Sequence, residues 1–144
     1  MNIEKELKNY NINIAKRDVY IPEKIEQRKE ELMHSTTSSL KQEPIFSNER
    51  KTSKVEDTVI KWEDDEEIRI LKKELVEISK NIIKLNKLLD ILDKKERDIL
   101  KAKYISKANN DDIADEYGYV DTNSISRFVR VTRNKLQRLE DELN

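Results

Sequence analysis

The chain has 144 residues, of which 41% are charged and only 35% hydrophobic, and its 29 basic and 30 acidic residues leave a formal net charge of −1. One glycine, two prolines and no cysteine exclude disulfides and thiolate metal sites, and they argue against a sheet-rich fold with many tight turns. The near-neutral charge also excludes indiscriminate binding to nucleic acid, so any DNA contact must come from a local basic patch.

The first third of the chain predicts two different segments. Residues 1–34 read as one or two short helices with a thin apolar stripe, which bury little and should be marginal alone. Residues 35–62 begin with a run of serines and threonines, contain Pro44 and carry few apolar side chains. Too little burial is available there to offset the entropy of ordering the backbone, so we predict a flexible polar linker.

Residues 63–92 carry the clearest periodicity of the sequence. Apolar residues alternate three and four positions apart without a break, which predicts a long helix with a heptad seam. Two partners could cover the seam: other helices of the same chain, or a second copy in a homodimer. The seam comprises Ile68, Leu71, Leu75, Ile78, Ile82, Leu85, Leu89 and Leu92.

Residues 93–144 predict a compact three-helix head. A capping box from Asp93 to Glu96 should start its first helix, and Asn109 or Asn110 should cap a short second one. Gly118 suits a left-handed helix end, and a last helix is predicted from about Ser124 to Leu143. The fold is therefore expected to be all-α, with a long central helix leading into a helix-turn-helix head. Its predicted core is Ile99, Leu100, Tyr104, Ile113, Ile125, Val129 and Leu136.

The last helix carries the candidate DNA-binding residues. Five basic residues and no acidic one lie between Asn123 and Leu139. Asparagine can pair with adenine and arginine with guanine, which suits the start of this helix to the major groove. Groove residues are predicted to be Asn123, Ser124, Ser126, Arg127 and Arg130, while Arg133 and Lys135 are predicted to contact phosphates. The alternative is an ordinary amphipathic helix with a solvated basic face.

This C-terminal stretch resembles region four of bacterial sigma factors. No counterpart of sigma region two precedes it, and the whole layout is similar to small phage regulators of the ArpU and RinA type. The resemblance implies a phage or prophage late-gene activator that binds double-stranded DNA and acts with host RNA polymerase. The turn from Gly118 to Ile125 is one residue longer than the usual sigma spacing. The matching positions are Leu92, Glu96, Arg97, Ile99, Leu100, Tyr104, Ile113, Ala114, Gly118, Ile125, Leu136 and Leu139.

Other function classes find less support in the sequence. It contains no nucleophile elbow, no glycine-rich phosphate loop and no metal-ligand spacing, so we expect no enzyme activity, cofactor or metal. No apolar run reaches transmembrane length and residues 1–10 lack a signal-peptide core, so a cytoplasmic location without membrane contact is expected. A DNA-recognition subunit of phage packaging and a helical protein-interaction module without DNA binding remain alternatives. The acidic residues near Asp111 are interpreted first as favourable charge at a helix N-terminus that also adds solubility, and the alternative is a surface that a basic partner protein binds.

Overall fold

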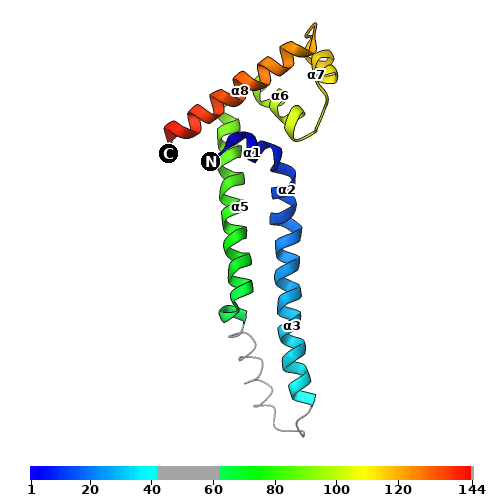
Figure 1. The fold of residues 1–144 in the computed structure, drawn as a ribbon, viewed down its shortest axis with the longest axis vertical. Helices are drawn as coiled ribbons and strands as arrows, with labels where there is room; N and C mark the ends of the chain where they lie inside the picture. Colours follow the sequence, from blue (N-terminus) through cyan, green and yellow to red (C-terminus); the bar gives the residue numbers. More distant parts are fainter. Residues whose placement is uncertain (42–61, 144) are drawn as a thin grey trace. The chain divides into compact units, whose positions relative to one another are not determined.

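The structure is a computed structural model that describes residues 1–41 and 62–143, and this part of the chain is helical without any strand. The prediction of an all-α fold is therefore confirmed (Figure 1). No described helix is both long enough and apolar enough to cross a membrane. The helices are α1 (Ile3–Lys8), α2 (Tyr10–Ala15), the π-helical turn η1 (Lys16–Tyr20), α3 (Ile21–Lys41), α5 (Glu66–Ile91), α6 (Lys94–Tyr104), α7 (Asn110–Tyr117) and α8 (Thr122–Leu143).

The predicted boundaries in the first third of the chain differ from the observed ones. Helix α3 continues to Lys41, so the helical segment does not end at residue 34 as predicted. Serine and threonine are poor but permissible helix residues, and a helix already under way extends through them at little cost. The rest of the predicted linker, residues 42–61, lies outside the described residues.

The chain forms two compact units, and they divide the N-terminal segment between them. The first unit contains residues 1–14 and 79–144, and the second contains residues 15–78. Residues 1–34 were predicted to bury little, and this is wrong for α1. Ile3 and Leu7 are both fully buried in the core of the first unit, because they lie on one face of α1 and meet apolar side chains distant in sequence.

The second unit has a small core supported by charged groups. Ile21 and Ile25 of α3 pack with Ile68 and Leu71 of α5. Beside them the guanidinium of Arg28 donates to the Asp65 carboxylate at 3.0 and 3.2 Å and lies 3.2 Å from Glu67. The hydrogen bond from Arg28 lowers the pKa of Asp65, and burial opposes that shift. Asp65 also caps α5, since its carboxylate accepts the Ile68 N–H at 3.1 Å.

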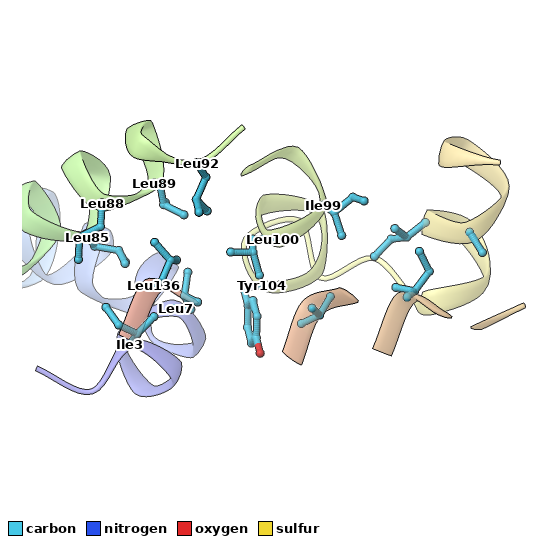
Figure 2. Close-up of a cluster of buried hydrophobic side chains, with 14 residues drawn as sticks. Ile3, Leu7, Leu85, Leu88, Leu89, Leu92, Ile99, Leu100, Tyr104 and Leu136 are labelled. Atoms are coloured by element: carbon cyan, nitrogen blue, oxygen red, sulfur yellow. The ribbon is translucent and has the colours of Figure 1, made fainter. Parts of the chain in front are cut away.

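The first unit has the larger core, to which five helices contribute. Figure 2 shows Ile3 and Leu7 of α1 gathered with Leu136 of α8 near Leu85 and Leu88 of α5, and α6 continues the same cluster. All seven residues predicted as the core of the head are buried: Ile99, Leu100, Tyr104, Ile113, Ile125, Val129 and Leu136.

The heptad seam of α5 packs within the chain. Its first residues, Ile68 and Leu71, belong to the core of the second unit, while Leu85, Leu89 and Leu92 belong to the core of the first. Of the two partners considered for the seam, the structure therefore shows the intramolecular one. A homodimer through residues 68–92 stays a prediction, and it would have to displace these contacts.

Local sequence signals set the ends of the helices in the head. The capping box is present, with the Asp93 N–H donating to Glu96 Oε1 at 3.3 Å. Asn109, rather than Asn110, caps α7 by accepting the Asp112 N–H at 2.8 Å. Gly118 ends α7 in the left-handed conformation with φ of 74°, as predicted. Helix α8 begins at Thr122, two residues before the predicted start at Ser124.

Candidate nucleic-acid interface

A short turn between α7 and α8 determines where the last helix begins. Gly118 can adopt its positive φ without steric cost, and the next N–H, that of Tyr119, donates to the Ala114 carbonyl at 2.8 Å. Three residues later Asp121 starts α8 by accepting the Ser124 N–H at 2.8 Å. This hydrogen bond holds the pKa of the Asp121 carboxyl below its ordinary value, and the charge of Arg127 adds a smaller effect.

An aromatic pair fixes the first half of α8 against the head. The Tyr119 and Phe128 rings lie 6.3 Å apart at an angle of 58°. Lys95 Nζ lies 4.7 Å from the centre of the Tyr119 ring and 5.9 Å from that of Phe128. Such cation–π geometry is mildly favourable at exposed sites. Lys95 therefore joins the start of α6 to the turn.

Helix α8 has a buried face and an exposed polar face. Ile125, Val129 and Leu136 are buried on the first. The exposed face follows from a rotation of 100° per residue, which aligns positions 123, 127, 130, 134 and 138 on the opposite side. These positions hold Asn123, Arg127, Arg130, Asn134 and Arg138, all of them exposed, and we call them the polar stripe.

Three of the predicted site residues lie in the first half of the polar stripe. The side chains of Asn123, Arg127 and Arg130 are exposed, and within the described residues no carboxylate forms an ion pair with either arginine. A cation that no internal carboxylate neutralises keeps its charge available for an external anion. The structure therefore brings these three residues together on one accessible surface.

The two predicted serines have partners inside the head. Ser124 is half-buried and belongs to the helix cap, where it hydrogen-bonds Asp121. Ser126 is exposed, and its Oγ accepts a hydrogen bond from Asn110 Nδ2 at 3.0 Å. Ser126 thus lies at the contact between α7 and α8, beside the polar stripe.

The two residues predicted to contact phosphates are engaged with acidic or polar groups of the same unit. Arg133 donates to Tyr104 Oη at 3.0 Å and lies 3.3 Å from Glu4 Oε1, with only 24% of its side chain exposed. Lys135 Nζ lies 3.2 Å from Glu96 Oε1 and is more exposed. Both cations are paired with a carboxylate, so their charge is less available to a phosphate than the charge of Arg127.

Helix α1 is held on the second half of α8 by residues that sequence reasoning did not single out for this role. The Gln137 carboxamide accepts the Ile3 N–H at 2.9 Å and donates to the Met1 carbonyl at 3.0 Å. Glu140, only 1% exposed, lies 2.7 Å from Lys84 Nζ and 3.3 Å from the Met1 amino group. A buried carboxylate needs such cations to offset its desolvation.

Arg138 was also absent from the predicted site, although it completes the polar stripe. Its spacing from Arg127 would have placed it there, because residues eleven positions apart return to nearly the same side of a helix. Its side chain is exposed in the structure.

The neighbouring helix α7 is acidic. Asp111, Asp112, Asp115 and Glu116 are all exposed on it. Desolvation raises the pKa of Tyr117 and the nearby charge of Glu116 adds to the shift. Among the described residues no group of three or more acidic or histidine side chains has a metal-binding arrangement. These carboxylates repel phosphates, so any nucleic acid on α8 must approach from the side of the polar stripe.

No protein-family model matches the chain, and no match is found among the curated proteins or among the solved structures.

Proposed function

We propose that this protein is a sequence-specific DNA-binding transcription regulator that reads duplex DNA with the first half of α8. One observation carries the proposal: Asn123, Arg127 and Arg130 form an exposed surface opposite the buried face of α8, and neither guanidinium forms an ion pair within residues 1–41 and 62–143. Asparagine and arginine are the side chains best suited to bidentate contacts with adenine and guanine. The contribution of this protein is binding and recruitment, with no chemical step.

The helix ends support the same proposal. A short capped helix, a turn at a left-handed glycine and a longer helix with a polar outer face make up the pattern of helix-turn-helix proteins. In that pattern the start of the second helix enters the major groove, and this is where Asn123 and Arg127 lie. The exposed carboxylates of α7 repel phosphates and limit binding to non-specific DNA.

The resemblance to sigma region four and to ArpU and RinA regulators extends the proposal. By this resemblance, the protein is proposed to activate late genes of a phage or prophage, with host RNA polymerase as its protein partner. The exposed carboxylates of α7 are a suitable surface for a basic region of that partner. The molecular mass of the protein in solution distinguishes an activator from a packaging subunit. An activator is expected to be a monomer or dimer, whereas a packaging subunit is expected to form a large ring.

Fluorescence anisotropy against a randomised AT-rich duplex pool tests the proposal, with the salt concentration varied. The wild-type protein should bind, and its affinity should fall steeply as salt rises. The double variant Arg127→Ala/Arg130→Ala should lose roughly a hundredfold in affinity, from the loss of two contacts in the groove.

Arg69→Ala/Arg97→Ala is the matched control, since it removes the same charge from α5 and α6 outside the polar stripe. It should bind as the wild type does apart from a small general effect of charge. Equal losses in the two double variants would show that α8 is not the reading helix. Absence of wild-type binding at low salt, with or without polymerase, would refute the proposed function.

A further inference from the structure

A chain of two hydrogen bonds joins three helices beside the polar stripe. Lys103 Nζ, in the last turn of α6, donates to Asn110 Oδ1 at 2.8 Å. Asn110 Nδ2, at the start of α7, donates to Ser126 Oγ in α8 at 3.0 Å. Because the carboxamide of Asn110 uses its oxygen toward one helix and its nitrogen toward another, its orientation is fixed from both sides.

This geometry makes Ser126 a hydrogen-bond donor toward solvent. A hydroxyl that already accepts a hydrogen bond still has its own hydrogen to donate. Serines in helices often donate back to the carbonyl four residues earlier, but in the described part of the chain Ser126 makes no such bond. Its side chain is exposed and lies one turn before Arg130. The Ser126 hydroxyl therefore offers a hydrogen-bond donor beside the guanidinium of Arg130, which is proposed to enter the groove.

Lys103 adds a positive charge at the other end of the chain. An ammonium group has three donors, and the bond to Asn110 uses one of them. The side chain is half-buried, so its head is confined more than that of an exposed lysine. A cation held in place at the edge of a groove-reading helix suits a phosphate, because phosphate contacts fix the register of the protein on the duplex.

We propose that the DNA interface extends from α8 onto α6 and α7 through this chain. Lys103 contacts a phosphate, Asn110 positions the Ser126 hydroxyl, and Ser126 donates to an acceptor on a base edge. The acceptors available in the major groove are N7 and O6 of guanine, N7 of adenine and O4 of thymine. This inference rests on the proposed function, since without duplex DNA none of the three residues has a ligand.

Lys103→Gln tests the phosphate contact in the full chain. Affinity for the duplex selected from the pool, and for its single-base variants, is measured over a series of salt concentrations. We expect the variant to weaken binding to every duplex by the same factor, roughly three- to tenfold, and to lower the slope of log K against log salt by about one.

Lys101→Gln is the matched control, because Lys101 is an exposed lysine of the same helix and its loss changes the net charge equally. It should leave the slope within error of the wild type. Equal slopes for the two variants would overturn the role of Lys103.

Ser126→Ala tests the base contact, and Asn110→Ala tests its positioning. Each should relax discrimination at one and the same base pair by roughly tenfold, with the salt slope unchanged. The variant carrying both changes should be no worse than either single variant, because one interaction has been removed from both sides. A purely structural role of Asn110 would instead lower the melting temperature and the affinity for all duplexes alike.

Asn110→Asp provides a second test of the same interaction if the Asn110→Ala variant does not fold. The carboxylate keeps the shape of the side chain and still accepts from Lys103, but it cannot donate to Ser126. It should relax discrimination at the base pair affected by Ser126→Ala. Additive effects of the Asn110 and Ser126 variants, or effects at different base pairs, would overturn this inference. The proposed function would still stand in that case, provided that the wild-type protein binds duplex DNA. Absence of wild-type binding would refute both.

Discussion

The two halves of α8 use the same residue types for different purposes. In the first half, Arg127 and Arg130 are exposed and no carboxylate of the described chain pairs with either. In the second half, Arg133 is held by Glu4 and Tyr104, while Gln137 and Glu140 hold the first residues of the chain. The basic side chains of one helix are therefore not equivalent, because some form ion pairs with carboxylates of the same unit and others stay available to an external anion.

The difference shows how one helix can be both a reader and a structural support. The second half is fixed to α1 by a buried carboxylate and a bridging carboxamide, which hold the helix in place. The first half then presents its polar stripe without needing internal partners.

The largest effect is expected for Leu7→Ala, which removes a fully buried side chain of α1 from the core around Leu136. The free energy of unfolding should fall by about 2–5 kcal/mol, from lost burial and the remaining cavity. Chemical denaturation measures it. Leu143→Ala, at a side chain 66% exposed, should change stability little. A small effect of Leu7→Ala would mean that α1 does not support the second half of α8.

Arg130→Ala and Arg133→Ala should separate the two halves directly. Arg130→Ala should weaken DNA binding roughly tenfold with an unchanged melting temperature, since its side chain has no ion-pair partner to lose among the described residues. Arg133→Ala should lower the melting temperature and affect binding less, because it removes the partner of Glu4 and Tyr104. Anisotropy and thermal melting on the same samples give both values. The reverse pattern would place the reading face on the other side of α8.

Gly118→Ala should cost about 1 kcal/mol, because a side chain at φ of 74° is strained. Apart from Gly118 and its two chain neighbours, no atom of the described residues lies within 4 Å of the added methyl group, so the cost comes from the backbone conformation. Lys107 has a φ of 59° with a side chain present, so Lys107→Gly should be neutral or stabilising. Thermal unfolding of both variants tests the pair. Equal destabilisation would argue against a left-handed end at α7.

A smaller effect is expected for Glu4→Gln, which releases Arg133 from its carboxylate. The freed guanidinium can reach phosphates, so affinity for DNA should rise by roughly two- to fivefold and its salt dependence should steepen. Glu142→Gln makes the same change of charge at an exposed position of α8 and controls for net charge. An increase of the same size in both variants would contradict a specific role of Glu4.

The smallest effect is expected for Asp121→Asn, which keeps the cap of α8 and removes its charge. The wild type should melt slightly higher at about pH 7, because a negative charge is favourable at a helix start. The pKa of Asp121 is lowered in the folded chain from its ordinary value of 3.8, so this stabilisation is complete above that pH and is lost as the pH falls through the lowered pKa. Melting curves over this range should converge in acid, and a constant difference would exclude a contribution of the charge.

Signals confined to a few neighbouring residues allowed much of the fold to be predicted. Capping chemistry at Asp93 and Asn109, the left-handed end at Gly118 and the apolar period of α5 each depend only on local sequence. The core residues of the head were predicted in the same way, from the helical spacing of apolar side chains. A short, charged stretch around Ile3 carries no comparable signal, because its burial depends on residues far along the chain.

The predicted site was incomplete for the same reason. Sequence reasoning grouped four basic residues of α8 in one site and had no means to see that Glu4 lies beside Arg133 or Glu96 beside Lys135. Helical spacing alone could have added Arg138. The contact from Asn110 to Ser126 required the crossing of two helices, which a linear pattern does not specify.

The division of the chain into residues 1–14 with 79–144, and residues 15–78 between them, has a consequence for the order of folding. The first unit is discontinuous in sequence, so its core needs contacts of very high contact order. Closing so long a loop costs entropy before any of these contacts forms, which slows folding. The intervening unit can pair α3 with α5 first and shorten the effective loop. Substitutions at Ile25 or Leu71 should then slow the folding of a core to which neither residue belongs.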